Sequence, residues 1–189
     1  MESINNNKKI KILYQKLGEF IAKFERLIFS IKYVKLILLS GNTDQVEILV
    51  KNYTAKETID ALAMMIDLAI KKNLIEKDDI QLYKALIKDL YELNEKRNKI
   101  IHSLWTIAIS GDKKDEISAW KPKRNKIFEW EKIDVNLLNE VIKKTEMLIK
   151  IVHAGGSLDR LVLGKDKVNY KLADIWKKEN DKWILIKRK

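Results

Sequence analysis

The sequence predicts a mostly α protein: an antiparallel bundle of four main helices, with a small antiparallel β-meander inserted after the third helix. Two observations lead to this fold class. Apolar residues recur at steps of three and four in four separate segments, as the buried stripe of an amphipathic helix requires. Between the third and fourth segments the period changes to two, which is typical of strands.

The first helix is predicted from an unbroken apolar stripe near the N-terminus. Its members are Ile10, Leu13, Leu17, Phe20, Phe24, Leu27, Ile31, Val34 and Leu38. Gly41 should end this helix, because glycine accepts the left-handed conformation that often follows a helix. The first helix is therefore expected to bury one face along its whole length.

The second helix should begin after Thr54, because Thr54 and Glu57 have the spacing of a capping box. It is expected to bury Ile59, Leu62, Ile66 and Ile70. Asn73 should close it. The third helix is predicted to run from a cap at Asp78 or Asp79 to about Ser103, since acidic residues favour the start of a helix.

The meander is predicted at about 104–132. Trp105, Ile107 and Ile109 alternate with smaller or polar residues, and Gly111-Asp112 offers a turn. Further strands are expected at 116–121 and 126–131, separated by Pro122. Asp134 should then cap a fourth helix. That helix should bury Leu138, Ile142, Leu148 and Val152, and it should stop at Gly155-Gly156.

The chain is expected to form one domain. Residues 1–156 would be the helical domain with its meander, and residues 157–189 a basic C-terminal extension packed on it. Within the extension we expect a short helix around Leu172 to Lys178 and a short strand from Trp183 to Ile186. From Arg160 onward, ten Lys or Arg stand against four Asp or Glu, so trimming this part should weaken any binding to a polyanion.

Composition excludes several kinds of site. The absence of cysteine removes disulfides, thiolate metal sites and cysteine nucleophiles. The two histidines lie far apart, the carboxylates lack ligand spacing, and no Gly-rich phosphate loop occurs, so we expect neither a metal nor a cofactor. Without a signal peptide or a membrane-spanning stretch, the protein should be cytoplasmic. The net charge of +11 suits RNA, but a Lys-rich composition explains it equally well.

Candidate functional residues lie late in the third helix. Asn94 and Arg97 fall on the apolar stripe, where a buried guanidinium must meet an anion, a carboxylate or a water-filled cleft. His102 follows Asn98 by four residues and therefore shares its face of the helix. A regular pattern interrupted by polar residues is where function is expected.

The segment Arg97-Asn98-Lys99-Ile100-Ile101-His102 resembles the signature of the HEPN superfamily: an Arg, a polar residue, three further residues and a His, late in a helix of a small antiparallel bundle. The resemblance covers these six residues and their helix, and to a lesser degree the first helix. It implies a metal-independent endoribonuclease of the toxin, abortive-infection or antiviral defence type. It also implies a homodimer with a composite active site and, for a toxin, a neutralising antitoxin protein.

In that mechanism His102 would transfer protons, Arg97 would bind the non-bridging phosphate oxygens, and Asn98 would orient either His102 or the phosphate. Lys96, Lys99 and Trp105 would bind RNA, although packing of the meander onto the bundle is the use that a tryptophan at position 105 favours. Glu25 and Glu95 are candidate partners for Arg97 or simply surface charges, and His153 is expected to be structural.

Two other functions remain open. The chain could be a catalytically silent HEPN-like module that binds RNA or a protein, with Arg97 and His102 kept as a structural pair. It could also be a structural bundle that dimerises through its first helix.

Overall fold

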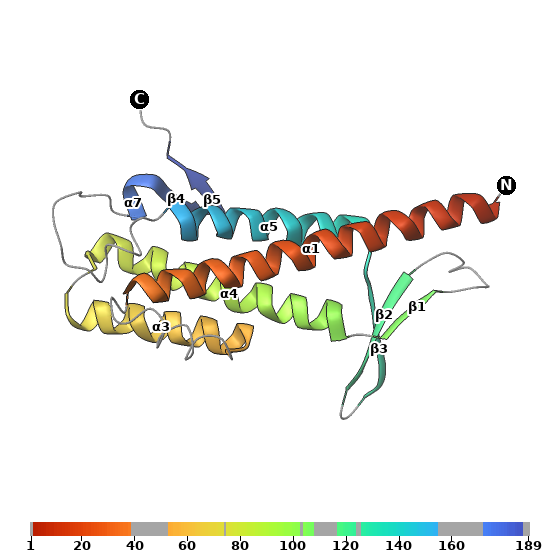
Figure 1. The fold of residues 1–189 in the computed structure, drawn as a ribbon, viewed down its shortest axis with the longest axis horizontal. Coiled ribbons are helices and arrows are strands. Elements are labelled where there is room, and N and C mark those ends of the chain that lie inside the picture. The colour runs from red at the N-terminus through yellow and green to blue at the C-terminus, as the bar shows by residue number, and fades with distance from the viewer. Residues whose placement is uncertain are drawn as a thin grey trace. The chain divides into compact units, whose positions relative to one another are not determined.

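The computed structural model describes the backbone of residues 2–38, 53–73, 75–102, 104–107, 117–123, 126–154 and 172–186, and the side chains of 8–33, 53–73, 75–102, 133–153, 172–173 and 175–186. Its helices are α1 (Glu2–Leu38), α3 (Ala55–Lys71), α4 (Lys77–His102), α5 (Val135–Ala154) and the short α7 (Leu172–Ile175) (Figure 1). Its strands are β1 (Leu104–Ile107), β2 (Ile117–Lys123), β3 (Lys126–Lys132), β4 (Trp176–Glu179) and β5 (Lys182–Leu185). The described chain is mostly helical, as predicted.

The chain divides into two compact units, and α1, α4 and α5 each contribute to both. The first, which we call the motif unit, comprises Met1–Phe24 and Leu93–Thr145. The second, the tail unit, comprises Glu25–Glu92 and Glu146–Lys189. The single domain, and its boundary near residue 157, stay predictions.

The core of the motif unit comes from the three long helices that enter it. The buried apolar side chains that these helices supply are Leu13, Phe20, Phe24, Leu93, Ile100, Leu138, Val141 and Ile142. Asp134 caps α5 as predicted, because its Oδ1 accepts the Leu137 N–H at 2.8 Å. The stripe of α1 meets this core at Leu13, Phe20 and Phe24, whereas Ile10 and Leu17 are only half-buried.

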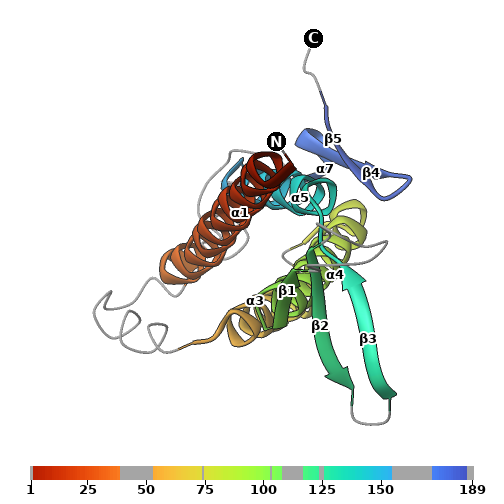
Figure 2. The same ribbon diagram turned by 90° about the vertical axis from the view of Figure 1, so that its right-hand side faces the viewer.

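The predicted meander is present as the sheet β1-β2-β3, in which both pairs of strands are antiparallel (Figure 2). Trp120 lies opposite Trp130 in the backbone register. One detail of the prediction is wrong: Pro122 lies inside β2 and does not separate it from β3. The register shifts between Lys121 and Lys123 at that point, since proline has no N–H to give to the ladder.

In the tail unit, α3 has the predicted capping box. The Thr54 N–H donates to Glu57 Oε2 at 2.7 Å, and the Glu57 N–H donates to Thr54 Oγ1 at 3.3 Å. Asn73 follows the end of the helix with a φ of 57°, a conformation that asparagine tolerates. The predicted buried positions hold for Ile59, Leu62 and Ile66, whereas Ile70 is half-buried and Ala69 is buried beside it.

Neither Asp78 nor Asp79 caps α4, because the helix already begins at Lys77. The buried Asp79 instead accepts the backbone N–H groups of Leu172 and Ala173, at 3.2 and 2.8 Å. This carboxylate therefore satisfies donors at the start of α7, which lies far away in the sequence. A one-dimensional pattern cannot reveal such a long-range cap.

The helix predicted around Leu172 to Lys178 is wrong after Ile175. Trp176 begins β4, which pairs with β5 in an antiparallel hairpin, close to the strand predicted from Trp183. The hairpin turns at Asn180 and Asp181, whose φ angles are 48° and 60°. Two central residues with positive φ are typical of a type I′ hairpin turn, so Asn-Asp was the sequence signal that the helix prediction overlooked.

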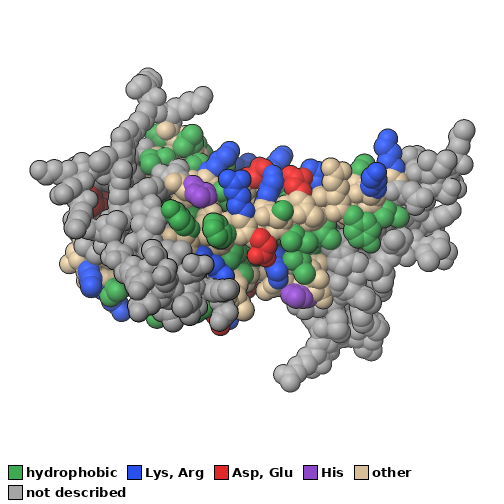
Figure 3. All heavy atoms as spheres, viewed as in Figure 1, with side chains coloured by type: hydrophobic (Ala, Val, Ile, Leu, Met, Phe, Trp, Pro, Cys, Tyr) green, Lys and Arg blue, Asp and Glu red, His purple; other side chains and the backbone are tan. Residues whose placement is uncertain are grey.

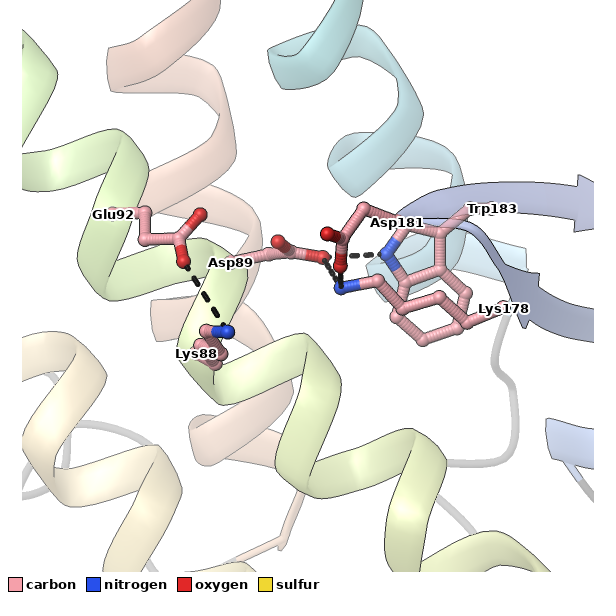
Figure 4. Close-up of polar contacts among 6 residues, drawn as sticks. All are labelled: Lys88, Asp89, Glu92, Lys178, Asp181 and Trp183. Atoms are coloured by element: carbon pink, nitrogen blue, oxygen red, sulfur yellow. Dashed lines mark hydrogen bonds and ion pairs between the residues drawn. The ribbon is translucent and has the colours of Figure 1, made fainter.

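The hairpin is fixed to α4 by one buried carboxylate (Figure 4). Asp89 accepts from Lys178 Nζ at 2.8 Å and from Trp183 Nε1 at 2.7 Å. The Trp176 and Trp183 side chains are buried. The tail is therefore part of the core of its unit and not only a charged surface.

Some predictions lie outside the described residues, namely the helix stops at Gly41 and at Gly155-Gly156 and the side chains of Val34 and Leu38. Among the helices that the structure describes, none combines the length and the apolar character needed to cross a membrane.

Candidate functional site

The last three turns of α4 carry the motif residues. Leu93 and Ile100 are buried there, and Asn94 is only 5% exposed. Arg97 is half-buried between them along the helix. The structure thus places two polar residues on the core stripe, as the sequence predicted, and Arg97 needs contacts that stabilise a partly desolvated charge.

Two uncharged groups lie close to the Arg97 guanidinium. Its Nη1 donates to Asn98 Oδ1 at 3.1 Å, and its Cζ lies 5.6 Å from the centroid of the Phe24 ring. The second distance is within the range of a cation–π interaction. The structure therefore brings Arg97 and Asn98 together, and the Asn98 carboxamide orients the guanidinium. The sequence left open whether Asn98 would orient His102 or the phosphate.

His102 is exposed and is the last residue of α4. By standard helix geometry it lies about 140° around the helix from Arg97 and about 7.5 Å further along it. Asn98, four residues earlier, shares its face. The imidazole is accessible to a substrate, and a group that spans the face of the helix could contact both His102 and the long Arg97 side chain.

Lys96 and Lys99 also lie on the last turns of α4. Together with Ile100, Ile133 and Leu137 they line a hollow of about 30 Å³. Lys96 Nζ also lies 3.0 Å from Glu140 Oε1 on α5. This ion pair is solvent-exposed and contributes little to stability. Both lysines are close to the motif in sequence, and Lys99 lies three residues before His102, which makes the two neighbours on the helix surface.

The remaining candidate residues are Trp105 on β1 and the two glutamates proposed as partners of Arg97. The backbone of Trp105 pairs with Ala119 in the sheet, and its side chain lies outside the described residues. Glu25 and Glu95 are both exposed. Among the side chains that the structure describes, no three His, Asp or Glu residues gather closely enough to hold a metal ion.

His153, the second histidine, contacts a buried serine. Its Nε2 lies 2.8 Å from Ser30 Oγ, which also lies 2.8 Å from the carbonyl oxygen of Arg26. Since a hydroxyl has one proton and Ser30 donates it to that carbonyl, His153 Nε2 is the donor to Ser30. The pair joins α5 to α1 within the tail unit, and it does not activate the serine as a nucleophile.

Positive charge is concentrated in the motif unit. Its sequence has seventeen Lys or Arg against ten Asp or Glu, whereas the tail unit has twenty-one against seventeen. Among described side chains the contrast is ten against four in the motif unit and twelve against twelve in the tail unit. Figure 3 shows Lys and Arg side chains along the N-terminal part of α1. The unit that holds the motif is therefore the one better suited to a polyanion.

We compared the chain with known protein families, curated proteins and solved structures. No family model matches the sequence, and neither a curated protein nor a solved structure shows significant similarity to it. The resemblance to the HEPN superfamily therefore depends on the Arg97 to His102 segment and on its place at the end of a helix.

Proposed function

We propose that this protein is a metal-independent endoribonuclease of the HEPN type, acting as a toxin or antiviral defence effector. One observation carries the proposal: an Arg and a His of a six-residue motif lie at the end of a long helix, with the His exposed and the Arg half-buried beside Asn98 and Phe24. The excess of basic residues in the same unit favours RNA as the substrate.

In the proposed reaction the 2′-oxygen of the RNA attacks the adjacent phosphorus, and the bond from phosphorus to the 5′-oxygen breaks. A base takes the proton of the 2′-hydroxyl, and an acid gives a proton to the leaving 5′-oxygen. Arg97 stabilises the extra negative charge on the non-bridging oxygens. The products are a 2′,3′-cyclic phosphate and a 5′-hydroxyl.

His102 is the proton-transfer group of this proposal. One copy supplies one such imidazole, while the reaction needs both a base and an acid, so two copies of α4 would form the site together. A dimer should therefore lose activity on dilution below its dissociation constant. Activity linear in protein concentration down to nanomolar levels, together with a monomeric mass by light scattering at micromolar concentration, would contradict the composite site.

The proposal is tested by RNA cleavage in EDTA with His102→Ala and Arg97→Ala. Loss of a proton-transfer group should lower the rate about 10² to 10⁴-fold, and loss of a charge-stabilising group about 10² to 10³-fold. His153→Ala and Arg26→Ala are the matched controls, since they remove the same residue types from the tail unit. Equal rates in all four variants, or no cleavage by the unaltered protein, would exclude the ribonuclease.

A silent HEPN-like module that binds RNA or protein is the second candidate. The contacts of Arg97 with Asn98 and Phe24 favour it, because they give the guanidinium a structural use. In that case Arg97→Ala should lower the melting temperature by several degrees, as expected when a half-buried charge loses its role in packing. A cleft-facing Arg97 predicts an almost unchanged melting temperature and lost cleavage.

A further inference from the structure

The N-terminal half of α1 carries an exposed row of two lysines and a tyrosine. Lys8, Lys11 and Tyr14 follow one another at steps of three residues, so they lie along one ridge of the helix surface. Both lysines are exposed, and Tyr14 is 52% exposed. The buried Leu13 lies about 160° around the helix from Lys11, so the row faces away from the core of the motif unit.

No carboxylate of the same stretch of helix neutralises the row. Residues 3–18 contain neither Asp nor Glu. The next carboxylate, that of Glu19, pairs with Lys16 at 2.8 Å and with Lys23 at 3.0 Å. Among the ion pairs of the described side chains, none includes a lysine of the row. The two ammonium groups of the row can therefore attract a polyanion.

Tyr14 differs from the other exposed tyrosine of α1 in its neighbours. Tyr33 is 53% exposed, almost the same fraction, and a single exposed tyrosine is ordinary on a protein surface. No Lys or Arg lies three or four residues from Tyr33, whereas Lys11 lies three residues before Tyr14. Tyr14 thus combines an aromatic face with adjacent positive charge. Unpaired nucleotides bind to this combination, because the bases stack on the ring and the phosphates contact the cations.

We propose that the row of Lys8, Lys11 and Tyr14 binds a single-stranded segment of RNA: the two ammonium groups contact phosphates, and an unpaired base stacks on the Tyr14 ring. The row extends about 9 Å along the helix axis, a length that about two or three nucleotides cover at about 3.4 Å each. This inference rests on the proposed function, which makes RNA the partner. It adds a preference for unpaired segments, and it assigns this preference to residues outside the Arg97 to His102 segment.

The experiment measures binding of a fluorescent RNA of about twelve nucleotides with 2′-O-methyl groups throughout, since such an RNA cannot be cleaved by its own 2′-oxygens. A duplex of the same length and chemistry is the second ligand. The bases of a duplex are already paired and stacked. A duplex can therefore contact the lysines of the row, but it offers no free base to Tyr14.

Tyr14→Ala should weaken binding of the single strand by at least about fivefold and leave binding of the duplex unchanged. Tyr14→Trp should keep the affinity for the single strand, because an indole also offers an aromatic face. Tyr33→Ala is the matched control, since it removes an equally exposed tyrosine from the same helix. If Tyr14→Ala and Tyr33→Ala bind the single strand equally well, no base stacks on Tyr14 and the proposal is wrong.

Lys8→Gln/Lys11→Gln should weaken binding of both ligands and should lower the salt slope for the single strand by about one unit, because two phosphate contacts are lost. Lys84→Gln/Lys88→Gln is the control, since it removes two exposed lysines from the part of α4 in the tail unit. All of these side chains are exposed, so every variant should keep the melting temperature of the unaltered protein. An unchanged salt slope in Lys8→Gln/Lys11→Gln would exclude these lysines as phosphate contacts.

The outcomes separate this inference from the proposed function. If the protein cleaves RNA in EDTA and Tyr14→Ala binds the single strand normally, the ribonuclease stands and the binding row is wrong. If the protein cleaves no RNA but Tyr14→Ala loses single-strand binding, the row stands and the proposed function fails. Binding to phosphatidylserine vesicles that requires Tyr14 and Lys11, with RNA binding unaffected by their replacement, would assign the row to a membrane surface and overturn the inference.

Discussion

The two halves of α4 each carry a charged side chain that is at least partly buried, and the groups that contact it differ between the halves. Asp89, in the tail unit, is buried, and its carboxylate meets the ammonium of Lys178 and the indole N–H of Trp183. Arg97, in the motif unit, is half-buried and contacts a phenyl ring and a carboxamide. The first environment cancels a charge, as a scaffold requires. The second places a guanidinium beside a phenyl ring and a carboxamide near the end of the helix that carries the motif.

The largest expected effect is a loss of folding stability when Asp89 of the tail unit is replaced. Asp89→Ala removes the buried carboxylate that pairs with Lys178, whose side chain is only 12% exposed, and leaves it only the longer 3.8 Å pair with the exposed Asp181; it should destabilise the fold by about 3 kcal/mol. Chemical unfolding measures this change. Glu92→Ala is the control on the same helix, because the pair that Glu92 forms with Lys88 is exposed and 3.8 Å long, and the loss of this pair should cost less than about 1 kcal/mol (Figure 4). Equal losses of stability in the two variants would mean that the buried contacts of Asp89 stabilise the fold no more than an exposed ion pair does.

A smaller effect concerns a second polar contact of the tail unit. The Tyr91 hydroxyl donates to Asp60 Oδ1 at 2.6 Å, and this hydrogen bond, with burial and the charges of Asp60 and Asp67, raises the pKa of Tyr91 to about 12. Because the folded-state pKa lies above the unfolded value of about 10, the resulting stability is complete below pH 10 and is lost as the pH rises toward 12.

Unfolding free energies measured from pH 8 to 12 test this dependence. Tyr91→Phe should remove the part that arises from this phenol, and should cost about 1 kcal/mol near neutral pH. Tyr14→Phe, which alters an exposed tyrosine of α1, is the control and should leave the profile unchanged. The account is wrong here if both variants give the same profile.

The smallest expected effect compares the charges of the two units. Removing residues 160–189 would also remove the buried Trp176 and Trp183, so deletion is a poor test of tail charge. Lys96→Gln/Lys99→Gln should lower the salt slope of RNA binding by up to about two counterions. Lys177→Gln/Lys182→Gln removes two exposed tail lysines. If this second pair of substitutions leaves the salt slope unchanged, the two tail lysines do not contact the RNA, and their charge reflects only the Lys-rich composition of the chain.

The sequence predicted the elements whose signals are local. Thr54 with Glu57 and Asp134 with Leu137 each lie within one helical turn, so their caps could be inferred from spacing. The errors arose where distant residues decide the structure. Asp79 was predicted to cap its own helix, yet its partners are Leu172 and Ala173.

The candidate site shows the same limit. The stripe predicted that Arg97 would be partly buried, because periodicity reports burial along one helix. It could not reveal Phe24 as the neighbour of Arg97, since that contact joins α1 to α4 and nothing local marks it. That Lys96 and Lys99 bind RNA beside His102 stays a prediction, to which the structure adds only that the two lysines line a common hollow.

The most direct test of the ribonuclease uses an RNA with a single preferred cleavage position and the same RNA with one 2′-O-methyl group on the nucleotide whose 2′-oxygen would attack. The account predicts cleavage of the first RNA in EDTA, with a 2′,3′-cyclic phosphate on the product, no cleavage at the methylated position, and a rate about 10² to 10⁴-fold lower with His102→Ala. Cleavage at the methylated position, or a product with a 5′-phosphate, would show that water is the nucleophile and would contradict the roles assigned to Arg97 and His102.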